Sequence, residues 1–274
     1  MTTLSLSQQF AKEIRIQSLK MVVRAKASHI GSALSIADIV AVLYQSVLTY
    51  DNDKPNLSSR DRFILSKGHA CVAVYAALAL KKFFPETELM GYGKNNSRLM
   101  NHISHKVPGV EFSTGSLGHG LPFGVGKAYF GQSTGKHWNT FVLLSDGELD
   151  EGSNWEALLF AGHHKLKNLK VIVDYNNLQS LASVTDTLEL QPLDQKLKAF
   201  GWDVRTVNGH DHEELRESLT AETTRPLAVI AQTIKGKGVR FMENQVTWHY
   251  RTPSPDELSA ALRELQSLST PRHG

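Results

Sequence analysis

Short apolar runs alternate with helical patterns through the second half of the chain, and this alternation constrains the fold more than any other feature. The runs Thr140–Ser145 and 169–174 are nearly continuous in apolar residues, and 204–207 and 227–233 are two more strand candidates; all four are too short for helices. Such runs are typical of parallel strands that are buried on both faces. The sequence therefore predicts an α/β fold, with a mostly parallel sheet flanked by helices on both faces.

Helical periodicity predicts the elements around these strands. The expected helices are 5–27, 36–48, 70–84, 154–164, 192–200, 213–220 and 256–268, with one more short strand at Arg62–Leu65. Ser35 is expected to cap the helix 36–48, with Asp38 in its first turn. No repeat or linker divides the chain, so residues 1–274 are expected to form one domain, with 269–274 as a frayed tail.

Composition excludes several classes of protein. A single cysteine, Cys71, cannot build a disulfide framework or a multi-cysteine zinc site, and it suits a cytoplasmic protein. The apolar runs are far shorter than a membrane span, and no signal peptide is evident. A net charge of +3 is too small to argue for nucleic acid. We therefore expect neither a membrane nor a nucleic-acid partner.

Polar residues follow two predicted strands at the point where each strand ends. Asp146 and Gly147 come directly after Thr140–Ser145, and Asn176 follows the next strand. Ligands collect at the carboxyl ends of parallel strands. A carboxylate and an amide oxygen suit Mg²⁺, which completes its shell with phosphate and water, and Gly147 allows close approach of backbone to a phosphate. Each motif alone is more often a simple turn, but together they favour a metal–diphosphate site.

The spacing of Asp-Gly and Asn-Asn resembles the signature of thiamine-diphosphate enzymes, and the surrounding motifs resemble those of the transketolases. In particular, the chain is similar to the N-terminal half of a split, two-subunit transketolase. The likeness covers nearly the whole chain through five separated motifs. It implies the thiamine-diphosphate-binding fold, with residues 1–274 as the diphosphate-binding domain.

The resemblance also implies roles for particular residues. The implied catalytic residues are His29, His102, His249 and Glu151. The implied cofactor-binding residues are His69, Gly115, Ser116, Leu117, Gly147, Glu148, Asn176 and His249. The implied metal ligands are Asp146, Asn176 and the carbonyl of Leu178. Glu151 matches an acid that links the two cofactor sites of a dimer.

Some residues depart from the family pattern, and others lie outside it. Ser28 and Ile30 flank His29 where the family usually has glycine and proline, and Tyr250 follows His249 where glycine is common. The pair His210 and His212 resembles a turn and a helix start. It lacks the cysteines or the spacing of a zinc site.

The implied activity belongs to carbohydrate metabolism. It is transfer of a two-carbon ketol unit from a ketose or its phosphate to an aldose acceptor, with thiamine diphosphate and Mg²⁺ or another divalent cation such as Ca²⁺ or Mn²⁺. In this family a glutamate from a pyrimidine-binding domain activates the cofactor, and the chain is expected to lack that domain. A C-terminal partner subunit is therefore expected, in an α2β2 heterotetramer.

Two alternatives stay open. The α-subunit of a 2-oxo-acid dehydrogenase first component shares the Asp-Gly and Asn motif, although His29, His102 and His249 suit polyhydroxylated substrates better. A non-catalytic scaffold subunit that only binds the cofactor is the second alternative. Assays of ketol transfer against oxidative decarboxylation distinguish the first alternative, and alanine at His29 or His249 distinguishes the second.

Overall fold

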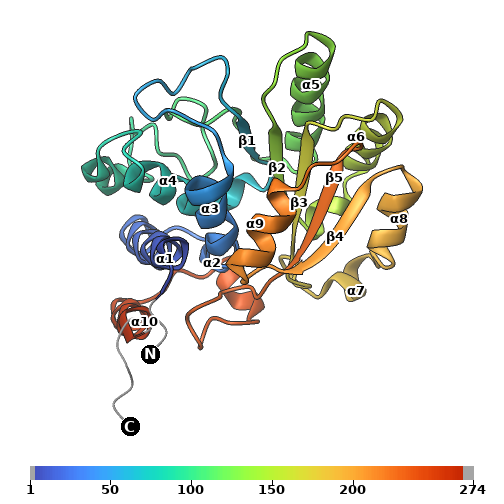
Figure 1. The fold of residues 1–274 in the computed structure, drawn as a ribbon. Coiled ribbons are helices and arrows are strands. Elements are labelled where there is room, and N and C mark those ends of the chain that lie inside the picture. Colours follow the sequence, from blue (N-terminus) through green and yellow to red (C-terminus); the bar gives the residue numbers. More distant parts are fainter. Residues whose placement is uncertain (1–3, 268–274) are drawn as a thin grey trace.

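A computed structural model describes residues 4–267, which contain a five-stranded parallel sheet (Figure 1). The strands are β1 (Arg62–Leu65), β2 (Thr140–Ser145), β3 (Leu169–Tyr175), β4 (Asp203–Asn208) and β5 (Leu227–Gln232). They pair in the order β1-β2-β3-β5-β4, and every pairing is parallel. The predicted parallel sheet is confirmed.

Helices cover both faces of this sheet (Figure 1). The α-helices are α1 (Leu6–Ala25), α2 (Ile30–Ser35), α3 (Ala37–Val42), α4 (Cys71–Leu80), α5 (Gly120–Ser133), α6 (Gly152–His163), α7 (Val184–Thr187), α8 (Leu193–Ala199), α9 (His212–Thr220) and α10 (Pro255–Ser267). The other helical segments are η1 (Leu43–Val47, a π-helix) and the 3₁₀ turns η2 (Gly68–Ala70), η3 (Glu86–Gly91), η4 (Gly147–Asp150) and η5 (Val246–His249).

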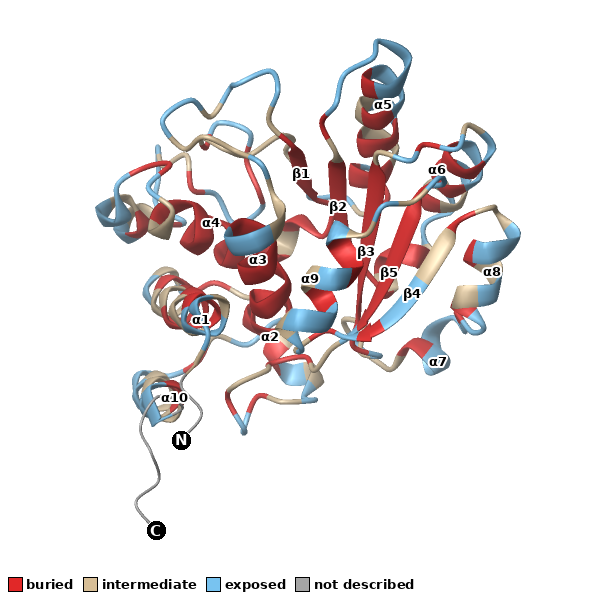
Figure 2. Cartoon of the chain, viewed as in Figure 1, coloured by how far each residue is buried: buried red, intermediate tan, exposed pale blue. Residues whose placement is uncertain are grey.

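Alternate side chains of each central strand enter two apolar cores, one on each face of the sheet. Phe141 and Leu143 of β2 pack in the core formed with α1 to α4, whereas Val142 and Leu144 pack in the core formed with α5, α6 and α8. Every residue of β2 and β3 is buried, as the red central strands of Figure 2 show. The carboxyl end of β2, which Asp146 directly follows, is therefore fixed between two apolar cores.

Strand β4 departs from the expectation that all the strands are buried on both faces. It is an edge strand that pairs only with β5, and Arg205 and Thr206 are exposed. The run 204–207 thus predicts the strand but not its burial. An edge strand can leave one of its faces exposed to solvent, so only some of its side chains are apolar and buried.

The helix expected over 36–48 is wrong in its start and its continuity. The helix breaks at Ile36, between α2 and α3, and continues after α3 as the π-helical η1. Ser35 does not cap it, because the Ser35 hydroxyl donates to the Ser32 carbonyl at 3.0 Å and to the Asp174 carboxylate at 2.7 Å. The Ser35 hydroxyl, which resembled a local helix cap, therefore makes a long-range contact with Asp174 near the end of β3.

The predicted tail 269–274 lies outside the described residues. Within residues 4–267, none of the helices is long and apolar enough to cross a membrane.

Candidate active site

Four histidines from separate segments of the chain meet at the carboxyl end of the sheet. The ring centroid of His29 lies 5.1 Å from that of His69, 5.9 Å from that of His102 and 5.0 Å from that of His249. All four rings line one cavity of about 240 Å³, together with Asp146 at the end of β2. The structure therefore brings together the histidines that the sequence motifs singled out.

His29 lies at the start of α2 in a left-handed backbone conformation, with φ of 70°. This conformation costs a non-glycine residue about 1 kcal/mol. Its N–H donates to the His249 carbonyl at 2.8 Å, and its Nδ1 lies 2.9 Å from the Ser28 hydroxyl. Ser28, one of the departures from the family pattern, thus contacts the predicted catalytic ring directly.

The cleft histidines are neutral at pH 7. Burial, together with His102 and Lys235, lowers the pKa of His29 to about 4. Burial, with Lys235 and His29 nearby, lowers the pKa of His249 to about 3. Burial also lowers the pKa of His69 well below its ordinary value. A neutral imidazole can accept a proton from a sugar hydroxyl or hydrogen-bond to it.

Asp146 and Asn176 lie side by side after β2 and β3, as predicted. The Asp146 carboxylate accepts hydrogen bonds from the backbone N–H groups of Gly147 at 2.8 Å, Asn176 at 2.9 Å and Asn177 at 2.7 Å. Burial and the neighbouring Asp174 nevertheless raise the pKa of Asp146 to about 6. A buried carboxylate whose charge is only partly compensated suits a bound cation.

The donor set around Asp146 fits a cation that shares its ligands with a phosphate. The Asn176 side chain and Leu178 line the same cavity as Asp146. Within the described part of the chain, no group of three or more His, Cys, Asp or Glu residues could hold a metal ion. One carboxylate, one amide oxygen and one carbonyl leave the remaining positions of a Mg²⁺ shell to diphosphate oxygens and water.

Two buried lysines, absent from the predicted site residues, complete the cleft. Lys67 forms an ion pair with Asp174. The Lys235 ammonium donates to the carbonyls of Leu178 at 3.0 Å and Gln179 at 2.8 Å, and it lies 3.1 Å from Nδ1 of His249. Burial and the charge of Lys67 lower the pKa of Lys235 to about 8. This incompletely compensated positive charge suits an anionic diphosphate, and the lysine next to glycines in the sequence was its signal.

Residues 114–120, the glycine-rich segment that precedes and opens α5, are divided between two cavities. Gly115 and Leu117 line the histidine cleft. Ser116, Leu117 and Glu151 line a second cavity of about 590 Å³ beside α5 and α6. The structure therefore does not bring Glu151 to the four histidines.

Glu148 is buried beneath the glycine-rich segment. Its carboxylate accepts hydrogen bonds from the Ser66 hydroxyl and from the N–H of Gly118 at 3.1 Å. Burial raises the pKa of Glu148. Glu148 thus ties the loop before α5 to the end of β1, and it is not among the residues that line the histidine cleft.

Gly68 explains how His69 reaches the cleft. A Cβ at Gly68 would overlap the carbonyl oxygen of Thr114. The Thr114 hydroxyl in turn donates to the Leu65 carbonyl at 2.6 Å. Only glycine allows the segment after β1 to pass this close to the glycine-rich segment.

The fold and cleft define an α/β protein that gathers acidic, basic and imidazole side chains at the carboxyl ends of adjacent parallel strands. Residues 6–266 match the thiamine diphosphate binding domain of transketolase. The chain belongs to the transketolase family.

Named relatives agree with this assignment. An apulose-4-phosphate transketolase subunit of Phocaeicola vulgatus is 37% identical over 92% of this chain and 90% of its own length. The protein of the same name from Actinobacillus succinogenes is 41% identical over 93% of this chain and 94% of its own. The crystal structure of transketolase from Campylobacter jejuni superposes with a TM-score of 0.91 at 28% identity, covering 97% of this chain and 43% of that one.

These comparisons confirm the predicted family, the enzyme class and the thiamine-diphosphate-binding fold. This chain spans less than half of the solved transketolase. Because these two relatives match the chain along nearly their whole length and are named transketolase subunits, the 2-oxo-acid dehydrogenase alternative is not favoured.

Proposed function

We propose that the chain is the diphosphate-binding subunit of a split transketolase that uses thiamine diphosphate and Mg²⁺, or a similar divalent cation such as Ca²⁺ or Mn²⁺. The observation that carries this proposal is the convergence of four histidines with Asp146 and Asn176 in one cavity. Relatives that are named as single transketolase subunits, and that resemble this chain along nearly their whole length, support a separate partner.

Two sets of residues in this chain would hold the divalent cation and the diphosphate of the cofactor. Asp146, Asn176 and the Leu178 carbonyl would hold the divalent cation. Lys235 and His69, with Gly147 and the glycine-rich residues Gly115, Ser116 and Leu117, would hold the diphosphate. Glu148 would support that binding from beneath the glycine-rich segment, and Glu151 would act toward the second cofactor site of a dimer. Bound thiamine diphosphate supplies the nucleophilic carbon that carries the two-carbon unit.

The histidines would handle the sugar. His29, His102 and His249 line the cleft as neutral rings, so each can hydrogen-bond a sugar hydroxyl or accept its proton. An ammonium only donates hydrogen bonds, so the contact from Lys235 leaves Nδ1 of His249 as an acceptor and its proton on Nε2. That contact would fix which His249 nitrogen faces the substrate.

The complete enzyme would need a second subunit. We propose that a C-terminal subunit supplies the pyrimidine-binding domain and the activating glutamate, in an α2β2 heterotetramer. The substrates would be a ketose or ketose phosphate and an aldose or aldose phosphate. Residues 1–274 would form one diphosphate-binding domain, and the single buried thiol of Cys71 supports a cytoplasmic location.

Reconstitution tests this function. The chain alone, with thiamine diphosphate and Mg²⁺, should transfer no ketol units, and adding a pyrimidine-domain subunit should restore transfer. His29→Ala and His249→Ala should each abolish most turnover in the reconstituted enzyme. Full activity of the chain alone, oxidative decarboxylation of a 2-oxo acid in place of ketol transfer, or unchanged turnover in both variants would each contradict the proposal.

A further inference from the structure

A buried charged cluster outside the cleft joins four segments of the chain. At its centre the Asp38 carboxylate of α3 accepts two hydrogen bonds from the Arg15 guanidinium, at 3.0 and 2.6 Å. The same carboxylate lies 2.6 Å from Nδ1 of His210 and 3.1 Å from Nε2 of His212. Asp38 is therefore surrounded by donors from α1 and from the segment that opens α9.

The hydrogen bonds fix the direction of the contact between His210 and Asp38. Nε2 of His210 accepts the N–H of Ile234, so its Nδ1 carries the proton that is donated to the Asp38 carboxylate. Burial would raise the pKa of Asp38, but Arg15 and the bonds from His210 and His212 outweigh it and hold that pKa well below its usual range. Asp38 is thus a fixed anion to which both rings are anchored.

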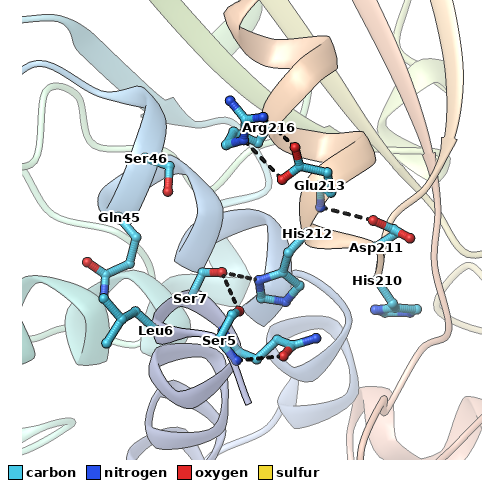
Figure 3. Close-up of a pocket in the computed structure, with 11 residues that line it drawn as sticks. Ser5, Leu6, Ser7, Gln45, Ser46, His210, Asp211, His212, Glu213 and Arg216 are labelled. Carbon is cyan, nitrogen blue, oxygen red and sulfur yellow. Dashed lines mark hydrogen bonds and ion pairs between the residues drawn. The ribbon is translucent and has the colours of Figure 1, made fainter. Parts of the chain in front are cut away.

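The two histidines differ in what their other nitrogen contacts. Nε2 of His210 accepts the backbone N–H of Ile234 at 2.9 Å, directly before Lys235. Nδ1 of His212 lies 2.8 Å from the Ser7 hydroxyl instead, as Figure 3 shows. Both rings line the same surface cavity of about 510 Å³, and their side chains are 11% and 10% exposed. Of these two rings, His210 is therefore the one that links Asp38 to residues 234–237, the segment from which Lys235 reaches the histidine cleft.

That segment, residues 234–237, is held at four points by hydrogen bonds to other parts of the chain, one of them from the Asn244 N–H to the Lys235 carbonyl at 2.9 Å. His210 holds the N–H of Ile234, the Arg15 guanidinium donates to the Lys237 carbonyl at 3.0 Å, and the N–H of Gly236 donates to the Gly31 carbonyl at 3.0 Å. Between these points the Lys235 side chain extends into the cleft. Its reach depends on where this short segment lies.

We propose that His210 is a positioning residue for cofactor binding, which holds the segment 234–237 against Asp38 so that Lys235 faces the diphosphate. His210 does not line the cleft, so it acts through the Ile234 backbone and not by touching the cofactor. The inference rests on the proposed function and adds a residue outside the five motifs that carry the family resemblance.

Matched substitutions separate positioning from simple stability. His210→Asn keeps a donor near the Nδ1 position for Asp38 but is too short to accept from Ile234. His212→Asn is the control, because His212 has the same anchor and a similar burial without the backbone contact. Thermal unfolding of each full-length variant checks that it is folded.

Two measurements follow. In the full chain without cofactor, amide exchange across residues 234–237 should be about tenfold faster in His210→Asn and nearly unchanged in His212→Asn, because one protecting hydrogen bond is lost. In the chain paired with its partner subunit, calorimetry with thiamine diphosphate and Mg²⁺ should show Kd raised about tenfold in His210→Asn only.

His210→Gln gives a second test that does not depend on the asparagine variant folding. Its longer amide can place an oxygen where Nε2 accepts from Ile234, so exchange and Kd should return close to wild type. Equal effects at His210 and His212, no effect at His210, or rapid exchange in the glutamine variant would each overturn the inference. A wild-type enzyme that binds no thiamine diphosphate would instead overturn the proposed function.

Discussion

Because the cleft disfavours protonation of each of its histidines, these residues should make the free energy of unfolding depend on pH. His29, His69 and His249 lie within 6 Å of one another, and the cations Lys67 and Lys235 lie nearby. Protonating any of these rings places another charge in a partly desolvated space. The folded state therefore disfavours protons that the unfolded chain binds freely.

This difference predicts a loss of stability in acid. The pKa values of His29 and His249 fall to about 4 and about 3 on folding, so the unfolded chain binds more protons once the pH drops below about 6.5. The free energy of unfolding, measured with urea, should fall between pH 7.5 and pH 5. In His249→Asn that fall should be smaller by about 1 kcal/mol, allowing for the partial exposure of the ring. The exposed His119→Asn serves as control, and an equal fall in all three proteins would contradict the explanation.

Lys235 supports a prediction about charge. Lys235→Met removes the buried ammonium that is proposed to face the diphosphate, and Kd for thiamine diphosphate with Mg²⁺ should rise about tenfold or more. Lys237→Met is the matched control, since the Lys237 side chain is 34% exposed and its ammonium lies 3.8 Å from the Glu243 carboxylate. Calorimetry of the two-subunit enzyme measures both. Comparable losses at both positions would show that general positive charge, and not Lys235 itself, matters.

At the scale of elements, glycines set how closely helices approach their neighbours. Gly162 near the end of α6 packs on the carbonyl of Phe200 at the end of α8, and a Cβ there would overlap that oxygen. Gly126 in α5 faces open space. Close packing therefore requires glycine at position 162 of α6 but not at position 126 of α5.

Alanine at these positions should change stability in opposite directions. Gly162→Ala should destabilise the chain by about 3 kcal/mol, because a backbone carbonyl cannot move aside as a side chain can. Gly126→Ala should stabilise it by about 1 kcal/mol, the ordinary gain of alanine over glycine within a helix. Chemical denaturation of the two variants measures both changes. A loss in both would mean that α5 is constrained by contacts outside this chain.

Local patterns predicted the elements far better than their junctions. The run Thr140–Ser145 is a strand with the bounds expected from its apolar composition, because burial between two helical layers leaves an unambiguous signature. The glycine-rich residues of α5 gave no helical signal, since Gly124 is there to let the helix approach Val142 of the sheet. Ser35 was misread because its partner, Asp174, is distant in the sequence.

The site shows the same division. The positions of Asp146 and Asn176 followed from the rule that parallel strands end at one edge, and the structure places them side by side. That the four histidines lie together in one cleft could be inferred only through the family resemblance, because their segments share no local pattern. The ion pair of Lys67 with Asp174 had no sequence signal, since charge pairing across the sheet depends on topology.

Across the whole molecule, apolar side chains gather on the outer surface of α5 and α6. The large exposed hydrophobic residues there are Tyr129, Phe130, Leu159 and Phe160. The rings of Tyr129 and Phe160 are 5.6 Å apart, and Phe160 also lines the cavity that contains Glu151. Because Glu151 is proposed to act toward a second cofactor site, we propose that this surface contacts a second copy of the chain.

Phe160→Glu should therefore weaken assembly without unfolding the chain. A charge placed on this surface would have to lose its hydration in an interface, so sedimentation velocity should show the two-subunit enzyme shifting toward smaller species at micromolar concentration. Leu188→Glu, a similarly exposed position just after α7, should leave the sedimentation unchanged. Dissociation in both variants, or in neither, would argue against this surface as the contact.

The Asp174 carboxylate has a consequence for the order in which the molecule is built. Its hydrogen-bond donors Ser35, Lys67 and Thr233 lie 139, 107 and 59 residues away along the chain. Closing such long loops is slow, and contacts between distant segments form after local ones. The contacts around Asp174 can be complete only after β5 and Thr233 have been synthesised, so cofactor capture should mark a late stage of folding rather than guide its start.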